Sequence, residues 1–457
     1  MSSLRQQIAF ILVFIAMAAA WYGCAPESSP PAAQESASEE KASAGKGQSP
    51  MDLVDQDRIV ELTQRMVRIN SEYERNVVHN HEEVAQLIAD EVKRIGLETE
   101  IIRPEEADFP AVVGRLRGSS GTPVLGMTQL YNTVYIGDRS LWAVDPLGGE
   151  VKDGRIWGRG ATNSKGSVAA MIETARVLKE SGAQLKGDLI VLFIPGEGGT
   201  EFCLPWLVEN RPEVIQADWY LAGGGGGNIV KKAGGHMWLK LIVRGHMAHP
   251  GFTVEDGRAP VNAIHKLNKI LPAVLDVDSW MTWEPDPLFA NYVSSQGEGR
   301  PFAEVNKIVG GYEVNMVPDR AEADIDIRLF PSQDPDQVQA ELEAVFARMK
   351  EEDPDLDVEI QRIGTQKVAD HYWEGLTEDD PLIAAIFDIG PNYTGQKPKW
   401  RMSAGGGRPD IWNLGSKWVS FGVGKGGNAH APDEWVDIDS LGQQAKLYAE
   451  LALRVLQ

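Results

Sequence analysis

Cysteine, positive charge and repetition are all scarce in this chain. Its 457 residues include two cysteines and carry a formal net charge of -22. A chain this acidic is poorly suited to a polyanion, so no nucleic-acid partner is expected. The sequence contains no internal repeat, and its glycine runs are not part of the strand, glycine-rich turn and helix that bind nucleotides. These absences argue against nucleic acid and against a nucleotide-binding turn, and they say little else about function.

The longest apolar run lies at the N-terminus. Arg5 precedes a short apolar stretch from Ile8 to Ala20, and Cys24 follows Gly23. These are features of a secretory signal, and the cysteine resembles the cleavage site of a bacterial lipoprotein. The alternative is an uncleaved membrane anchor, for which the run is somewhat short. We predict a signal peptide over 1–23, lipidation at Cys24 and a lipid-anchored location in the cell envelope, on the periplasmic or outer-membrane side.

The segment 24–50 is predicted to be a flexible tether behind the lipid. It is rich in Ser, Ala, Glu, Gly and Pro, a composition that cannot bury a core. If Cys24 carries the lipid, Cys203 has no disulfide partner and is expected to be a small buried apolar residue.

The rest of the chain has globular composition, with 43% hydrophobic and 24% charged residues, and it is long enough for two domains. Strands and helices alternate over 51–232, which predicts an α/β, doubly wound domain. Alternating apolar and polar residues in 236–244 and 321–329, with helical spacing in 261–271 and 336–349, predict an inserted α+β domain over 233–350. The first domain is expected to resume over 351–457.

The stretch from Gly126 to Gly166 is the expected ligand site. An apolar strand leads into a polar turn, and a glycine-rich segment leads into a helix, with Asn132 and Asn163 at the turn ends. In open α/β sheets, the loops at the carboxyl ends of strands form the site.

Four segments carry a resemblance to a known family. They are LWAVDPLGGEVKDGRIWGRGA from Leu141, VRGHMAHPG from Val243, NMVPDRAEADIDIR from Asn315 and GNAHAPDEWV from Gly427. In this order, the chain from Asp55 onward resembles the zinc aminoacylases, glutamate carboxypeptidases and succinyl-diaminopimelate desuccinylases, which form metallopeptidase family twenty. The resemblance implies a zinc-exopeptidase-like domain, an inserted lid that also forms a homodimer, and a peptide or N-acyl amino acid ligand.

The resemblance also implies two zinc ions, bridged by an Asp, with a Glu as general base. The position of the first ligand is Leu130, the Asp that would orient that ligand is Asn132, and the bridging position is Asn163. The general base is Glu197. The remaining ligand positions are Gly198, Gly224 and His430. A one-residue deletion would instead make Glu197 a ligand and remove the base.

Most metal ligands are therefore replaced, and no cofactor is expected, although the family would use two zinc ions. Burying a carboxylate without its cation costs roughly several kcal/mol of stability, even after the structure relaxes. A site that has lost its metal is therefore expected to lose the carboxylate ligands as well. Glu197 is then either a weak base or a remnant acid. His430 is either the ligand of one weakly held ion or a hydrogen-bonded imidazole.

Three lid residues match substrate contacts of the family: His249, which would reach the partner subunit's site, Asn315 and Arg328. Arg328 could grip a carboxylate with its planar fork. Alternatively, the three hold the dimer or the lid strands together. The leading hypothesis is a pseudoenzyme that binds a peptide or N-acyl amino acid. The alternatives are an active amidohydrolase with a one-metal or metal-free site, and a structural dimer.

Overall fold

The computed structural model describes residues 48–457 except 75–76, 105–108, 198–201, 256, 291–292, 295, 331–332, 364–375, 404–410 and 412–413. The predicted signal peptide, the predicted lipidation site Cys24, most of the predicted tether and the ligand position Gly198 lie outside the described residues. Within the described part, no helix is both long and apolar enough to cross a membrane.

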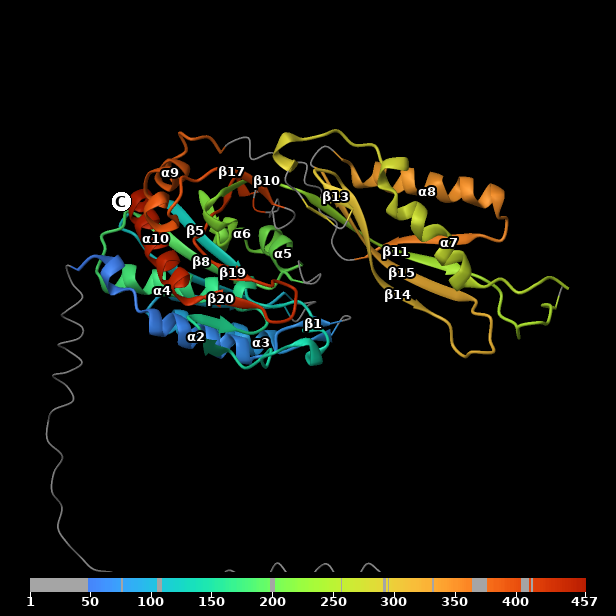
Figure 1. Cartoon of the computed structure of the whole chain (residues 1–457). Coiled ribbons are helices and arrows are strands. Elements are labelled where there is room, and N and C mark those ends of the chain that lie inside the picture. The colour runs from blue at the N-terminus through green and yellow to red at the C-terminus, as the bar shows by residue number, and fades with distance from the viewer. Residues whose placement is uncertain are drawn as a thin grey trace, which may run out of the picture. The chain divides into compact units, whose positions relative to one another are not determined.

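An eight-stranded mixed sheet is the centre of the first domain (Figure 1). Its order is β17-β10-β18-β9-β5-β8-β4-β3, and β18, β9, β5 and β8 are parallel to one another. The pairings β18–β10, β8–β4 and β4–β3 are antiparallel. The strands are β3 (Glu98–Ile102), β4 (Ala111–Leu116), β5 (Gly121–Leu130), β8 (Gly187–Ile194), β9 (Trp219–Ala222), β10 (Ile229–Ala233), β17 (Trp400–Ser403) and β18 (Lys417–Ser420). The α/β architecture expected from the sequence is confirmed, with antiparallel strands toward both edges.

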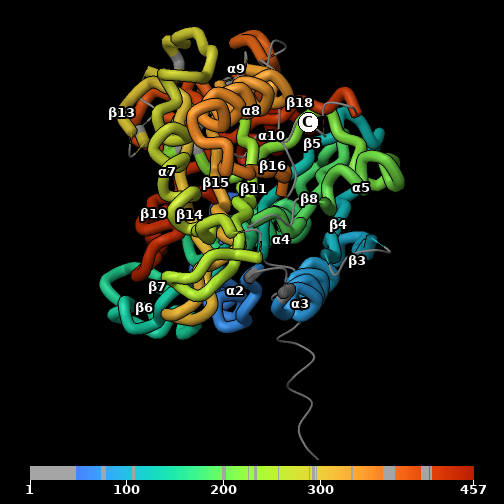
Figure 2. The backbone as a smooth tube through the Cα atoms, turned by 90° about the vertical axis from the view of Figure 1, so that its right-hand side faces the viewer, coloured from blue at the N-terminus to red at the C-terminus, as the bar shows by residue number. Residues whose placement is uncertain are grey.

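Helices bury this sheet because its central strands are apolar on both faces. All eight residues of β8 are buried, as a continuous apolar run in a covered sheet requires. The helices α4 and α10 pack on each other and on β5 and β8, and α3 lies beside β3 and β4 (Figure 2). The helices of this domain are α2 (Gln56–Arg68), α3 (His81–Arg94), α4 (Gly166–Glu180), α5 (Cys203–Asn210), α6 (Pro212–Ile215), α9 (Pro381–Thr394) and α10 (Ile438–Leu456). Cys203 is buried, as expected.

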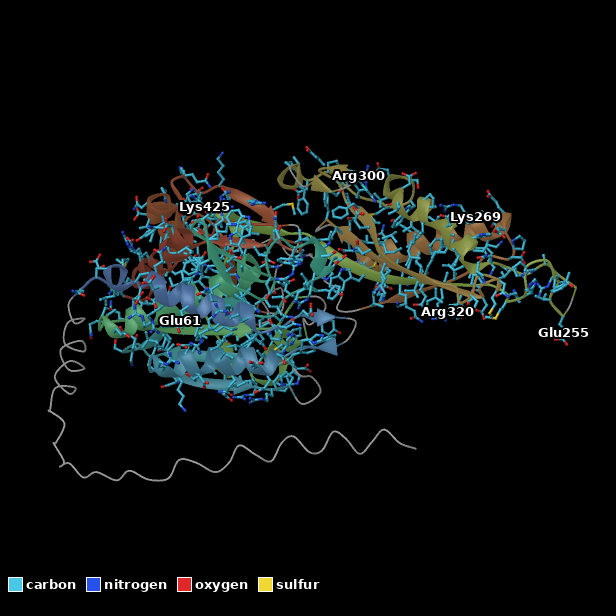
Figure 3. The ribbon with its side chains drawn as sticks, turned by 60° about the horizontal axis from the view of Figure 1, so that its bottom comes forward. Glu61, Glu255, Lys269, Arg300, Arg320 and Lys425 are labelled. Atoms are coloured by element: carbon cyan, nitrogen blue, oxygen red, sulfur yellow. The ribbon has the colours of Figure 1, made fainter. Side chains whose placement is uncertain are left out.

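The inserted domain is a four-stranded antiparallel sheet with two helices along one face (Figure 1). Its strands, in the order β14-β15-β11-β16, are β11 (Gly235–Arg244), β14 (Phe302–Gly310), β15 (Arg320–Leu329) and β16 (Asp357–Arg362). The helices are α7 (Ala263–Leu275) and α8 (Pro335–Glu352). Along β15 the Ala and Ile side chains are buried, while most of the charged ones remain accessible. In Figure 3, the label of Arg320, on β15, marks the polar face of this sheet, and the label of Lys269, on α7, marks the side that the helices cover.

The inserted sheet continues past the boundary that the sequence placed at residue 350. β16 pairs with β11 along its whole length, so the chain leaves this sheet only after Arg362. The strand is short and lies at an edge, and its alternating apolar residues Val358 and Ile360 are only partly buried, so the pattern is too brief to mark a strand as clearly as in β11 and β15.

A small antiparallel sheet, ordered β19-β20-β7-β6, joins two distant parts of the first domain. It contains β6 (Glu150–Lys152), β7 (Arg155–Trp157), β19 (Gly426–Gly427) and β20 (Trp435–Asp437). Pairing of β7 with β20 brings the segment before Asn163 beside the segment after His430. The remaining short elements are β1 (Tyr73–Glu74), β2 (Val77–Val78), β12 (Val293–Ser294), β13 (Gly297–Glu298), η1 (Pro50–Leu53), η2 (Arg139–Leu141), η3 (Ala161–Lys165), η4 (Gly225–Gly227), η5 (Val277–Ser279) and η6 (Pro287–Phe289).

Candidate functional site

The site lies where the central parallel strands end. β5 ends at Leu130, and the turns after β8 and β9 contain Glu197 and Gly224. Carboxyl ends of parallel strands meet at one edge of a sheet, which places these three positions along the same edge. The small sheet adds the segments that carry Asn163 and His430.

Asn132 maintains the shape of the turn after β8. Its side chain is fully buried, and its Oδ1 accepts hydrogen bonds from the backbone N–H groups of Gly196 at 2.9 Å and Glu197 at 3.0 Å. Its Nδ2 donates to the carbonyl oxygen of Glu197 at 3.2 Å. The amide therefore fixes the backbone that presents the Glu197 carboxylate.

Asn163 joins the two remaining acid and imidazole groups of the site. Its Nδ2 lies 2.9 Å from Glu197 Oε1 and 2.8 Å from His430 Nε2. Its Oδ1 accepts a hydrogen bond from Ser164 Oγ at 2.8 Å. At the position where the resemblance puts a carboxylate shared by two cations, one amide group here bridges a carboxylate and an imidazole directly.

Glu197 and His430 also contact each other. His430 Nε2 lies 3.5 Å from Glu197 Oε2, and hydrogen bonding to this carboxylate raises the pKa of His430 above its ordinary value. When Nε2 accepts from the Asn163 amide, the imidazole is neutral, with its proton on Nδ1. When the ring is protonated, Nε2–H can donate to Glu197 and no longer accepts from the Asn163 amide.

A buried ion pair, which the sequence did not reveal, holds the two loops of the site. Glu434 Oε1 accepts from the backbone N–H groups of Thr162 at 3.1 Å and Asn163 at 2.9 Å, and its Oε2 accepts from Arg159 Nη1 at 2.7 Å. Arg159 also donates to the carbonyl oxygen of Ala431, beside His430. Both residues belong to the quoted motifs, but only the fold shows that their charges meet in the interior.

Whether two zinc ions fit this site depends on the side chains at the ligand positions. Leu130 supplies an aliphatic group, Asn163 an amide and Gly224 no side chain at positions that the resemblance assigns to ligands. Gly224 also has a φ of +127°, which residues with a side chain rarely adopt. Nowhere in the described ranges do three His, Cys, Asp or Glu residues gather as a metal centre would require. The described donors do not fit two zinc ions.

The lid residues fall into two separate groups. His249 and Asn315 are exposed on neighbouring loops, which are joined by a bridge in which Val317 N–H donates to the Ala248 carbonyl at 2.9 Å. Arg328 lies toward the other end of β15, eight residues beyond Arg320, which is about 26 Å along a strand. One copy of the chain therefore cannot bring all three side chains to one small ligand.

Comparison with known proteins identifies the family. A model described as peptidase family M20/M25/M40 matches residues 131–454. A probable succinyl-diaminopimelate desuccinylase of Staphylococcus epidermidis is 25% identical over 418 residues, covering 87% of this chain and 98% of the relative. A cysteinylglycine-S-conjugate dipeptidase of Corynebacterium striatum is 28% identical over 224 residues, covering 45% of this chain and 48% of the relative.

Solved structures share the fold at lower identity. A dipeptidase of Saccharomyces cerevisiae matches with a TM-score of 0.73 at 14% identity, covering 89% of this chain and 98% of the other. Human carnosine dipeptidase 1 matches with a TM-score of 0.70 at 16% identity, covering 94% of this chain and all of the other. The family match spans well over half of the sequence and includes both the site and the lid. The chain therefore belongs to peptidase family M20/M25/M40.

Proposed function

We propose that this protein is a metal-independent member of its family, which binds a peptide or N-acyl amino acid without zinc-dependent hydrolysis. The observation that carries the proposal is the Asn163 bridge. Its amide nitrogen lies within hydrogen-bonding distance of both Glu197 and His430. A cation held by these two groups would have to displace a bridging amide, and it would gain no further charged ligand from Leu130 or Gly224.

The binding role rests on the lid. Arg328 offers a planar donor group suited to a carboxylate, and His249 and Asn315 are exposed on adjoining loops. Related proteins carry names that denote action on peptides or N-succinyl amino acids, which is consistent with a ligand of this chemistry.

A second copy of the chain would bring these groups together. Around β14 and the adjoining loop, apolar side chains are exposed: 56% for Ile308, 52% for Val309, 60% for Tyr312 and 101% for Val314. The edge of β14 pairs only with β15 among the described strands, so this surface is suited to bury against its own copy. A homodimer through the lid would let His249 and Asn315 of one copy serve the site of the other.

A catalytic role for the same site is the second candidate. Glu197 Oε2 and His430 Nε2 are 3.5 Å apart, an arrangement in which a carboxylate and an imidazole can exchange a proton with a bound water. Without a metal ion to lower the pKa of that water, the activity would be slow. The named relatives are enzymes, which keeps this amidohydrolase candidate open to test.

Metal content and ligand binding decide between these functions. Protein purified with zinc present should retain fewer than one tightly held ion per chain, and two retained ions would refute the proposal. Ligand binding should be measured by calorimetry with dipeptides and N-acyl amino acids, with Arg328→Ala expected to weaken it. Hydrolysis of the same compounds that Glu197→Gln abolishes would instead support the catalytic candidate.

The proposal includes an envelope location through a lipid on Cys24, based on the N-terminal sequence alone. Mass spectrometry of the N-terminal peptide from membranes should find a diacylglycerol-modified Cys24. Recovery of an unmodified, uncleaved N-terminus would refute this part of the proposal while leaving the site unaffected.

A further inference from the structure

The guanidinium of Arg328 is held by a carboxylate of its own strand. Arg328 Nε donates to Asp326 Oδ2 at 2.9 Å, and Nη2 donates to the same oxygen at 2.7 Å. Both side chains are largely shielded, with 24% of Arg328 and 17% of Asp326 exposed. Asp326 therefore occupies one edge of the donor fork and fixes its direction.

A residue on the neighbouring strand fixes Asp326 in turn. Trp238 on β11 lies opposite Asp326 in the register, and its indole Nε1–H donates to Asp326 Oδ1 at 3.1 Å. The ring of His236, which lies opposite Arg328, packs on that of Trp238, with ring centroids 4.8 Å apart and planes tilted by 31°. The Asp326 carboxylate accepts at both oxygens, so this negative charge stays beside Arg328 whether or not a ligand is bound.

The surrounding sheet face has no surplus positive charge. Lys240 is shared between Asp324 at 2.7 Å and Glu322 at 3.2 Å, and Lys307 lies 3.4 Å from Asp324. Glu304 lies opposite Asp326 on β14. The polar residues of this face include five cations and six carboxylates: Arg244, Arg320, Arg328, Lys240 and Lys307 against Glu304, Glu322, Asp324, Asp326, Asp357 and Glu359. The face therefore carries one surplus negative charge, and each carboxylate that a ligand brings adds to the repulsion.

We propose that Asp326 is a specificity-determining residue that restricts the Arg328 site to ligands with a single carboxylate. This inference rests on the proposed binding function and narrows its ligand class. Arg328 supplies one donor group for a carboxylate, and Asp326 neutralises the positive charge of Arg328 before a ligand binds. An acidic side chain or an acidic acyl group close to the gripped carboxylate then adds repulsion without gaining a new partner.

The experiment compares two ligands of nearly equal size. Binding of Ala-Gln and Ala-Glu to the full-length protein is measured by calorimetry at neutral pH and about 0.1 M salt, where the screening length is about 10 Å. We expect Ala-Gln to bind between about twofold and thirtyfold more tightly, the span that a unit charge at about 8 Å gives for dielectric constants between 80 and 20. Asp326→Asn should reduce this ratio by at least about twofold, and added salt should reduce it in the wild type.

Glu359→Gln is the matched control. It also removes one negative charge from the same sheet, but Glu359 pairs with Ile242, six residues along β11 from the residue opposite Arg328. That separation is about 20 Å along the strand, beyond the screening length, so the ratio should not change. A general loss of lid structure would lower binding of both peptides together and leave the ratio intact.

Each result has a definite reading. A wild type that binds both peptides equally, or an Asp326→Asn protein with an unchanged ratio, overturns the inference and leaves the proposed function standing. A wild type that binds neither peptide nor any N-acyl amino acid overturns both. A ratio that collapses in Asp326→Asn and persists in Glu359→Gln supports the inference.

Discussion

The Asn163 bridge makes a quantitative prediction for Asn163→Asp. The substitution keeps the size of the side chain but exchanges an N–H donor, 2.9 Å from Glu197 Oε1, for a second carboxylate oxygen. Two unit charges about 4 Å apart repel by about 4 kcal/mol at an effective dielectric constant of 20. Proton uptake and small movements relieve part of this repulsion, so we expect a loss of about 2–4 kcal/mol in the free energy of unfolding.

Denaturant unfolding of chelator-treated protein at neutral pH measures this loss. The deficit should shrink in acid, because one of the two adjacent carboxyl groups then takes up a proton. Asn306→Asp, at an exposed position of β14, is the control and should change the stability by less than about 0.5 kcal/mol. An Asn163→Asp protein as stable as the wild type would refute the interpretation of the bridge. Recovery of full stability on adding zinc would show instead that the site still accepts a cation.

Two further results are expected. His81 is buried, its Nε2 lies 3.1 Å from the Ser71 carbonyl oxygen, and burial lowers its pKa from 6.5 to about 4. The folded state therefore binds fewer protons than the unfolded state between these two pKa values, and the free energy of unfolding should fall by about 3 kcal/mol as the pH drops through that window. In denaturation measured at several pH values, His81→Gln should flatten this dependence, whereas the exposed His265→Gln should leave it in place. An unchanged slope in His81→Gln would contradict the assignment. The exposed apolar surface of β14 should be the dimer interface, so Ile308→Lys should yield monomers in light scattering. The control Lys269→Glu, on α7, should remain dimeric. A wild type that is monomeric at micromolar concentration would refute the dimer.

The family and the general architecture were readable from the sequence. Four motifs in one order identified the family, and the apolar run of β8 and the alternation of β15 predicted a buried strand and a half-exposed one. The two strand patterns are local signals, because each depends only on the period of apolar residues along one element. The replaced positions Leu130, Asn163 and Gly224 were equally visible, since identity at a motif position requires no coordinates.

What the replacements do was decided by tertiary structure. Asn163, Glu197 and His430 come from three segments separated by up to 267 residues. The pairing of β7 with β20 brings Asn163 and His430 together, and the end of β8 places Glu197 beside them. The Arg159–Glu434 pair was missed because charged residues are expected at the surface unless a partner is known. The same applies to Asp326, whose contact with Trp238 depends on strand register. The sequence by itself determined the family and the altered positions, while long-range pairing determined which of them meet.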